Sequence, residues 1–151
     1  GGTWLPPRLV KRVWNADGSE GSLPRVPEPR AMFTRHDALQ VQEAMTHTMT
    51  EGTGRNVALR GYTSAGKTGT TEKLVDGRYA DDRHIGSFVC WAPASSARQA
   101  ELLALVVIDD PRQGGHYGSE TAAPVVQRVL QFALERLEIQ PDAPVLAETR
   151  R

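Results

Sequence analysis

The segment Gly61–Thr71 constrains the fold of this chain more than any other, because it satisfies two incompatible motifs. Gly61–Thr68 fits the phosphate-binding pattern G-x-x-x-x-G-K-[ST], in which the lysine binds a nucleotide phosphate. Lys67–Gly69 is the Lys-Thr-Gly motif of a class of serine acyl-transferases, in which the lysine binds a peptide carboxylate. The first interpretation requires a helix that begins at Lys67, whereas the second requires a strand.

The residues that follow Lys67 favour a strand. A phosphate loop holds its ligand with the N-terminal amides of a helix. Here Thr68–Thr71 contains three threonines and a glycine, which cost about 3 kcal/mol relative to alanine in a helix, and no apolar stripe of helical period offsets that cost. Asp76-Gly77, a strong hairpin turn pair, follows shortly afterwards.

One further pattern keeps the nucleotide alternative open. Leu103–Asp110 is an apolar run that ends in aspartate, similar to the strand that holds magnesium in P-loop enzymes. The same run is also typical of a buried strand that leads into the turn Asp110-Pro111. Because Arg55–Arg60 is too polar to be the buried strand that precedes a phosphate loop, the P-loop nucleotidase is the weaker interpretation.

Composition excludes several classes of function. A length of 151 residues suits one core, and the formal net charge of zero gives no electrostatic reason for binding nucleic acid. The longest apolar run, Leu102–Ile108, is too short to span a bilayer. Cys90 is the single cysteine, so no internal disulfide is possible. His36 and His47 lack a carboxylate partner at metal-binding spacing, and we expect neither a metal nor a cofactor.

The order of elements predicts an α+β fold with three parts. Residues 1–33 form a connecting segment with a short strand at Leu9–Trp14 and a proline-rich linker at Ser22–Pro29. Residues 34–137 form the main body, and residues 138–151 form a tail that we expect to be disordered. The main body is predicted to contain a helix that Thr34 and Asp37 cap and that ends near Thr50, three antiparallel strands, and a final helix. The strands are expected at Ser64–Val75, Tyr79–Trp91 and Glu101–Ile108.

The apolar residues of the two predicted helices indicate which faces are buried. In the first helix the stripe consists of Ala38, Val41, Met45 and Met49. In the final helix, which has Pro124 in its first turn, the face consists of Val126, Val129, Leu130, Ala133, Leu134 and Leu137.

Several motifs in order resemble the carboxyl-terminal part of penicillin-binding protein transpeptidases, above all the monofunctional class B enzymes. The motifs are Glu51–Gly54, Ala65–Thr70, Gly86–Pro93, Asp109–Pro111 and Tyr117–Pro124. The resemblance implies a β-lactamase/transpeptidase-like domain in which an antiparallel sheet flanked by helices backs a helical lobe. It also implies a D,D-transpeptidase that cross-links peptidoglycan stem peptides by serine acyl transfer and that β-lactam antibiotics acylate. Such a parent protein is anchored in the inner membrane of the bacterial cell envelope and works outside the cytoplasm with cell-wall synthesis or divisome proteins.

The predicted site is the strand segment Lys67–Thr70. Lys67 is expected to bind the carboxylate of the substrate, since a hydrogen bond to a charged group contributes about 1.5 to 3 kcal/mol. Thr68 can donate a hydroxyl to the same carboxylate, and Gly69 leaves room for an extended peptide at the strand edge. The resemblance assigns the backbone N–H of Thr70 to the oxyanion hole, where the loss of one donor costs about a hundredfold in rate.

The sequence lacks the other two motifs of these enzymes, S-x-x-K and S-D-N. Asn15 and Asn56 are the only asparagines, and neither stands two residues after a serine. Ser64–Lys67 matches S-x-x-K, but it shares its lysine with the carboxylate motif and leads into a strand, so we interpret it as a coincidence. We therefore expect this chain to be the back part of a transpeptidase domain and to be inactive alone, because the nucleophile belongs to an earlier part. A β-lactam sensor, a D,D-carboxypeptidase of the same fold and a non-catalytic interaction module are the alternatives.

For four other residues, the sequence predicts a location in the fold and no specific catalytic role. His84 is assigned to a solvated cluster of loop charges, and Trp91 to the core of the sheet. His116 and Tyr117 lie in the loop before the final helix, and the resemblance implies that this loop borders the cleft. Two interpretations remain for these residues: a role in binding, or no role beyond that of a mobile surface loop.

Overall fold

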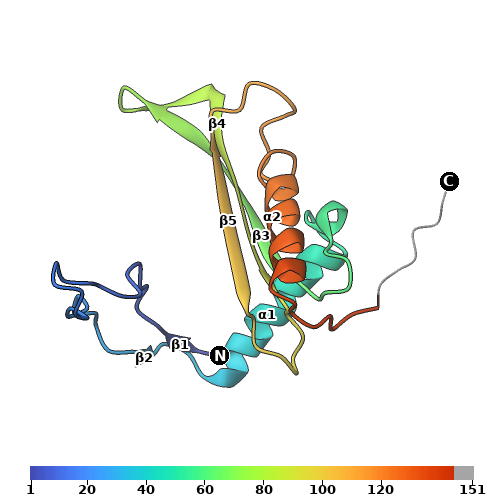
Figure 1. Ribbon diagram of the computed structural model, residues 1–151. Helices are drawn as coiled ribbons and strands as arrows, with labels where there is room; N and C mark the ends of the chain where they lie inside the picture. The colour runs from blue at the N-terminus through green and yellow to red at the C-terminus, as the bar shows by residue number, and fades with distance from the viewer. Residues whose placement is uncertain (145–151) are drawn as a thin grey trace. The chain divides into compact units, whose positions relative to one another are not determined.

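The computed structural model describes residues 1–144 and divides the chain into two compact units (Figure 1). The first unit comprises residues 1–39, and the second begins at Gln40. The sequence places this boundary at residues 33 and 34, just before the first helix, whereas the structure places it inside that helix. None of the helices in the described part of the chain is both long and apolar enough to cross a membrane.

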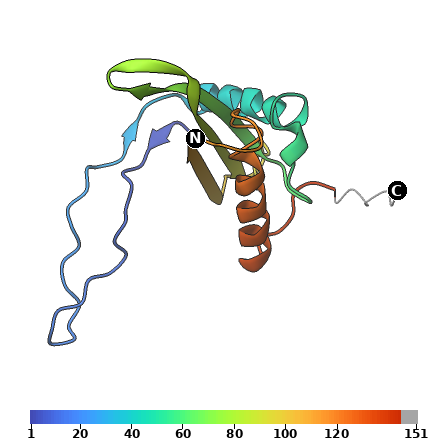
Figure 2. The ribbon, with the colours of Figure 1, turned by 90° about the horizontal axis from the view of Figure 1, so that it is seen from above.

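The first unit is a long loop closed at its base by two short strands. β1 (Thr3–Trp4) pairs antiparallel with β2 (Arg30–Ala31), and two extended arms run from them to a turn (Figure 2). The predicted strand at Leu9–Trp14 is wrong: only Trp14 forms an isolated bridge, to Glu20, and the Leu9 side chain is 99% exposed. An apolar run forms a strand only where a partner covers it, and here none does. Residues 22–29 have no regular structure, as the prolines predict.

The first helix, α1 (Arg35–Thr50), begins where the sequence predicts. The Asp37 amide donates to Thr34 Oγ1 over 3.1 Å, and the Thr34 amide donates to Asp37 Oδ2 over 3.3 Å. This reciprocal capping box satisfies amides that the first turn leaves without helical partners. Met49 is buried, but Val41, predicted for the same stripe, is 56% exposed.

Three strands form the antiparallel meander that the sequence predicts. β3 (Ala65–Val75), β4 (Arg78–Ala92) and β5 (Leu102–Asp109) pair in the order β3-β4-β5. Asp76 and Gly77 connect the first two strands with φ angles of 50° and 79°. Positive φ at both central residues is the geometry of the hairpin turn that an Asp-Gly pair favours.

One face of this sheet packs against the final helix, α2 (Ala123–Arg136) (Figure 1). Phe88, Cys90 and Ala92 alternate along β4 and are buried, as are Val126 and Leu130 of α2. Leu134, one turn further along, completes the helix face. Val129 and Leu137 were predicted for that face, but they are 50% and 60% exposed, because the stripe of α2 that packs against β4 and β5 is narrower than predicted.

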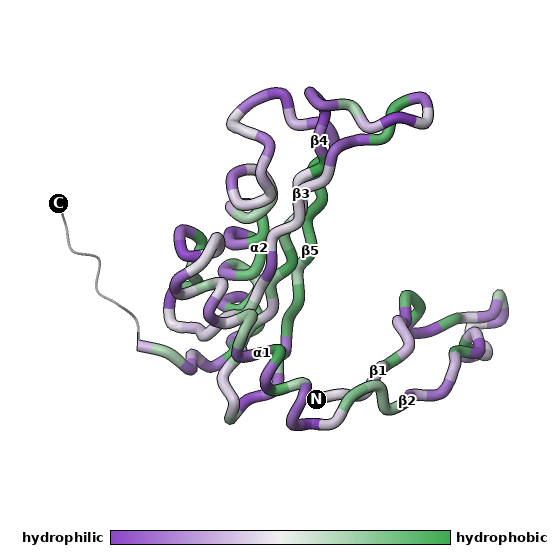
Figure 3. The backbone as a smooth tube through the Cα atoms, turned by 180° about the vertical axis from the view of Figure 1, so that it is seen from behind, coloured by the Kyte–Doolittle hydropathy of each residue, from purple (hydrophilic) through white to green (hydrophobic). Residues whose placement is uncertain are grey.

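The opposite face of the sheet is apolar and exposed along β5. Leu103, Leu105 and Val107 are 65%, 60% and 55% exposed, and Figure 3 shows β5 as a hydrophobic strand. Trp91, paired with Leu103, lies on this face and is half-buried, so the prediction that it packs in the core is wrong.

The residues after α2 make specific contacts where disorder was expected. Tyr62 Oη donates to the Ile139 carbonyl over 2.8 Å, and Asp142 accepts hydrogen bonds from the Thr63 amide and hydroxyl over 2.8 and 2.6 Å. These bonds hold residues 139–142 in place, and residues 145–151 of the predicted tail lie outside the described residues.

Candidate active site

The segment Lys67–Thr70 occupies the middle of β3, the first strand in the sheet order. β3 pairs only with β4, so among the described strands its other edge has no partner. An unpaired edge of this kind can accept an extended peptide as an additional strand.

The strand places the four predicted residues on two faces. Pairing with Val89 and Ser87 puts Lys67 and Gly69 on the exposed apolar face, and pairing with Phe88 puts Thr68 on the side of the core. The Lys67 side chain is exposed, and its Nζ donates to the Thr68 carbonyl over 2.9 Å.

Thr68 has a partner that the sequence did not indicate. Its Oγ1 lies 3.3 Å from Thr53 Oγ1, in the turn that follows α1. The Glu51–Gly54 motif therefore contacts the Lys-Thr-Gly strand directly.

Gly69 lies close to a side chain of the neighbouring strand. A Cβ atom at this position would lie 2.6 Å from Ser87 Oγ, well inside van der Waals contact. Ser87 Oγ in turn donates to the Gly69 carbonyl over a long 3.4 Å. A side chain here would displace Ser87 as well as obstruct the strand edge.

The Thr70 hydroxyl fastens the loop that precedes α2 to β3. Thr70 Oγ1 accepts a hydrogen bond from the buried Gly118 amide over 3.1 Å. A Cβ at Gly118 would approach the Ser87 carbonyl oxygen to 2.1 Å, so only glycine allows this approach. Sequence reasoning missed Gly118, although its position within a recognisable motif was a signal.

The structure does not give Ser64–Lys67 the geometry of a nucleophile motif. Ser64 is only 6% exposed and precedes β3, whereas Lys67 is exposed on the strand. A serine and a lysine three residues apart lie close together on a helix but not on a strand. Burial raises the pKa of the Cys90 thiol to about 12, and a hydrogen bond with Ser64 opposes this shift.

The extended conformation of β3 contradicts the phosphate-loop interpretation. Residues 67–75 are extended, so the helix N-terminus that would hold a phosphate does not form at Lys67. At the end of β5, Asp109 binds Lys73 over 2.7 Å instead of standing free for a magnesium ion. Asp110 accepts from Arg83 Nε over 2.8 Å, and this bond lowers the pKa of its carboxyl group.

His84 and His116 come together beside the site. The His84 and His116 rings stack with centroids 4.3 Å apart, and the Tyr117 ring lies 4.2 Å from His116. His84 is half-buried in β4, so its assignment to a solvated loop cluster is wrong. A hollow of about 470 Å³ adjoins these rings, and it is lined by Thr70, Thr71, Glu72, Tyr79, His84, His116 and Tyr117.

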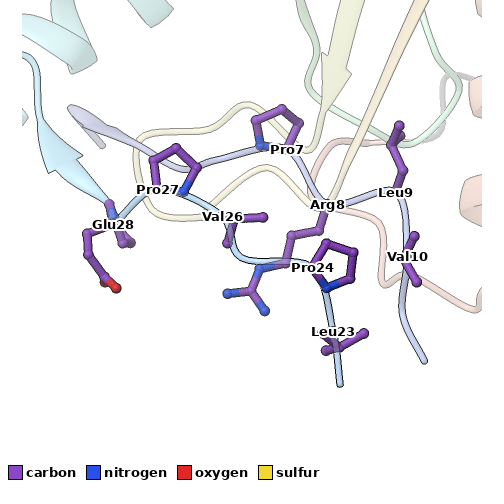
Figure 4. Close-up of a pocket in the computed structure, with 10 residues that line it drawn as sticks. Pro7, Arg8, Leu9, Val10, Leu23, Pro24, Val26, Pro27 and Glu28 are labelled. Carbon is purple, nitrogen blue, oxygen red and sulfur yellow. The ribbon is translucent and has the colours of Figure 1, made fainter. Parts of the chain in front are cut away.

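A second hollow, of about 460 Å³, lies within the first unit, between its two arms (Figure 4). Pro7, Leu9, Pro24 and Pro27 are among its lining residues, and Figure 4 shows Arg8 alongside Val26 and Pro24. None of the residues predicted to act on a substrate lies here.

The family follows from comparison with known proteins. The family model described as penicillin-binding protein transpeptidase domain matches residues 1–131. The chain belongs to the penicillin-binding protein transpeptidase family. It is 37% identical over 120 residues to the probable peptidoglycan D,D-transpeptidase PenA of Neisseria flavescens, a match that covers 79% of this chain and 29% of that protein. It is 33% identical over 153 aligned residues to the peptidoglycan D,D-transpeptidase FtsI of Escherichia coli K12, covering 94% of this chain and 25% of that protein. The chain thus spans less than a third of the length of these transpeptidases.

Solved structures show the same fold. Penicillin-binding protein 3 of Mycobacterium tuberculosis complexed with aztreonam superposes with a TM-score of 0.77 at 24% identity, over 99% of this chain and 35% of that one. The transpeptidase domain of Burkholderia pseudomallei penicillin-binding protein 3 gives a TM-score of 0.66 at 28% identity, over 83% of this chain and 38% of that one. The predicted α+β transpeptidase fold is therefore confirmed.

Proposed function

We propose that this chain forms the substrate-binding strand of a serine D,D-transpeptidase that cross-links peptidoglycan stem peptides. The observation that carries the proposal is the Lys-Thr-Gly-Thr segment in the middle of a strand whose outer edge pairs with none of the described strands, with the Lys67 side chain exposed. Membership of the transpeptidase family supports it.

In this proposal the stem peptide lies extended along the free edge of β3. Lys67 and the Thr68 hydroxyl bind its terminal carboxylate, and the Thr70 amide donates to the carbonyl oxygen that becomes negative in the tetrahedral intermediate. A serine oxygen attacks the carbonyl carbon, and the terminal D-alanine leaves as its amine. The amine of a second stem peptide then attacks the resulting ester and releases the serine.

The nucleophilic serine comes from outside this chain. Ser64 is buried, and no other S-x-x-K occurs in the sequence. We therefore expect that fluorescent penicillin does not acylate the 151-residue chain, and intact mass spectrometry checks this. A covalent adduct on Ser64 would contradict the assignment.

Side-chain substitutions test the roles within a transpeptidase that carries this chain together with an S-x-x-K segment. Lys67→Ala and Thr68→Val should slow acylation sharply, because the lost contacts position the carbonyl as well as bind the ligand. Lys73→Ala is the matched control, since Lys73 lies on the same strand but pairs with Asp109. Thr70→Ala keeps the amide and should be milder than Lys67→Ala. Gly69→Val should abolish acylation while the circular dichroism spectrum stays native. If Lys67→Ala and Lys73→Ala slowed acylation equally, the proposal would be refuted.

Cellular context follows from the same proposal. We infer that the working protein acts at the bacterial cell envelope, outside the cytoplasm, with cell-wall synthesis or divisome proteins as partners. PenA and FtsI, the similar proteins, are named as peptidoglycan D,D-transpeptidases. Transfer to an acceptor amine, measured against hydrolysis to the free acid, separates the transpeptidase from a carboxypeptidase of the same fold.

A further inference from the structure

The first unit is a hairpin that is paired at both ends and open in the middle. At its base Thr3 pairs with Ala31, and near its turn Trp14 bridges Glu20. The two contacts share one register, because Trp14 lies as far beyond Thr3 as Glu20 lies before Ala31. Between them the outgoing arm, residues 5–13, and the returning arm, residues 21–29, run apart (Figure 2). No backbone hydrogen bond joins residues 8–12 to any other described residue.

Prolines explain why the ladder does not continue from one end to the other. The Gly21 amide donates to the carbonyl of Val13, directly opposite, over 2.8 Å. Hydrogen-bonded pairs recur at every second residue of an antiparallel ladder. In the shared register one of the later pairs would be Pro7 with Pro27, and neither proline has an N–H to donate. The two arms therefore cannot satisfy each other along their length.

The outgoing arm nevertheless keeps the chemistry of a strand. Residues 8–12 contain no proline, so each of them offers both an N–H group and a carbonyl oxygen. The Leu9 side chain is 99% exposed and the Val10 side chain is 42% exposed. A run of unpaired donors and acceptors that carries exposed apolar side chains is a template for the addition of another strand.

The charge of the outgoing arm selects among the strands that it could take. Arg8, Lys11 and Arg12 are its charged residues, and all three are exposed. None of them forms an ion pair with another described residue. The returning arm is balanced instead, because it carries Arg25 and Glu28. An acidic segment matches the outgoing arm, and a basic segment is repelled by it.

The hollow between the arms offers space to the side chains of an added strand. Its volume is about 460 Å³, and both arms line it (Figure 4). Leu9 and Val10 contribute from the outgoing arm, and Leu23 and Val26 contribute from the returning arm. This apolar lining suits aliphatic side chains, which lose contact with water when they enter it.

We propose that residues 8–12 form a docking strand, to which an extended acidic segment of a partner protein adds through backbone hydrogen bonds. The carboxylates of the partner lie near Arg8, Lys11 and Arg12, and its aliphatic side chains occupy the hollow. The inference goes beyond the proposed function, because it concerns a surface of the first unit and does not depend on the role of Lys67.

A designed peptide tests the docking strand on the 151-residue chain. The probe is N-acetyl-Thr-Glu-Val-Glu-Val-Glu-Thr-amide. One control peptide has lysine in place of each glutamate. A second control keeps every side chain but is methylated on the backbone nitrogens of its central Val-Glu-Val. Nitrogen-15 NMR titration gives the affinities, and hydrogen exchange reports backbone bonding. We expect only the acidic, unmethylated peptide to shift the amides of residues 8–12 and to slow their exchange.

Two charge-reversal variants separate the arms. The double variant Lys11→Glu with Arg12→Glu should weaken the acidic peptide by at least about fivefold, since it replaces two exposed attractions with two repulsions. Arg25→Glu is the matched control on the returning arm, and it should change the affinity by less than about twofold, because salt screens a charge that makes no direct contact.

Three results would overturn the proposal. The first is an acidic peptide that leaves the amides of residues 8–12 unshifted, and the second is equally tight binding of either control peptide. The third is binding of the chain to vesicles of phosphatidylcholine and phosphatidylglycerol, lost in the Lys11→Glu, Arg12→Glu variant, while the peptide does not bind. That third result would make the arm a lipid-binding surface instead of a docking strand.

Discussion

The hydrogen bond between Thr70 and Gly118 leads to a quantitative prediction about stability. Thr70→Val keeps the shape of the side chain but removes the acceptor, which leaves the buried Gly118 amide without its partner. An unsatisfied buried amide costs about 1 to 3 kcal/mol, so we expect the free energy of unfolding to fall by that amount. Thr70→Ser keeps the oxygen and should lose less than about 0.5 kcal/mol.

Strand propensity makes this comparison sharper. Valine favours a strand more than serine does, so propensity alone predicts that Thr70→Val is the more stable variant. A larger loss for valine must therefore come from the hydroxyl group. Thr71→Val is the matched control, because the Thr71 hydroxyl donates only to the carbonyl of its own neighbour, Glu72, over 3.2 Å.

Urea unfolding followed by tryptophan fluorescence measures these differences at submicromolar concentration, where self-association is weakest. Hydrogen exchange at the Gly118 amide provides an independent reading, and it should accelerate by about 5- to 150-fold in Thr70→Val. The reasoning is refuted if Thr70→Val is as stable as Thr70→Ser, or if Thr71→Val costs as much as Thr70→Val.

Three further predictions concern the chain as a whole. Calorimetry should show no specific binding of magnesium-ATP, because Lys67 lies on a strand; micromolar binding that Lys67→Ala abolishes would overturn the assignment. Iodoacetamide at pH 8 should alkylate Cys90 in the native chain at least about a thousandfold more slowly than in the unfolded chain. The reason is that a pKa of about 12 in place of 9.0 lowers the thiolate fraction by about that factor. Rapid labelling of the native chain would show that the core is open. The exposed face of β5 should cause self-association that Leu105→Glu reduces in sedimentation velocity, and a monomeric, cooperatively melting parent chain would contradict this.

Local signals in the sequence predicted the regular elements well. The Asp76-Gly77 pair fixed a turn with two positive φ angles, and Thr34 with Asp37 fixed the start of α1. Each of these features depends on residues close together in the chain. The order of the strands followed from the short connections between them.

The errors arose where a distant partner decides the outcome. Leu9–Trp14 has the composition of a strand, but the pairing in the first unit occurs at Thr3–Trp4, whose partner lies near residue 30. Val41 and Val129 fit the helical period, yet they face solvent because the sheet covers only part of each stripe. Periodicity identifies a candidate face and does not fix its width.

The sequence predicted which residues form the site, but not which residues they contact. Lys67–Thr70 could be named from the sequence, but the partners of Thr68 and Thr70 lie 15 and 48 residues away along the chain. The stacking of His84 on His116 depends likewise on a loop crossing the end of the sheet. No local pattern encodes such contacts.

The contact between Lys67 and the ligand carboxylate is the most direct test of the proposed function. Acylation rates are measured for a penicillin and for its methyl ester, with the unchanged sequence and with Lys67→Ala, in a transpeptidase that carries this chain and an S-x-x-K segment. A hydrogen bond to a charged group contributes about 1.5 to 3 kcal/mol, so Lys67→Ala should slow the acid by about 10- to 150-fold. The ester should be slowed far less, because it offers no carboxylate to bind. Equal slowing of the acid and the ester would contradict the role of Lys67 as the carboxylate-binding residue.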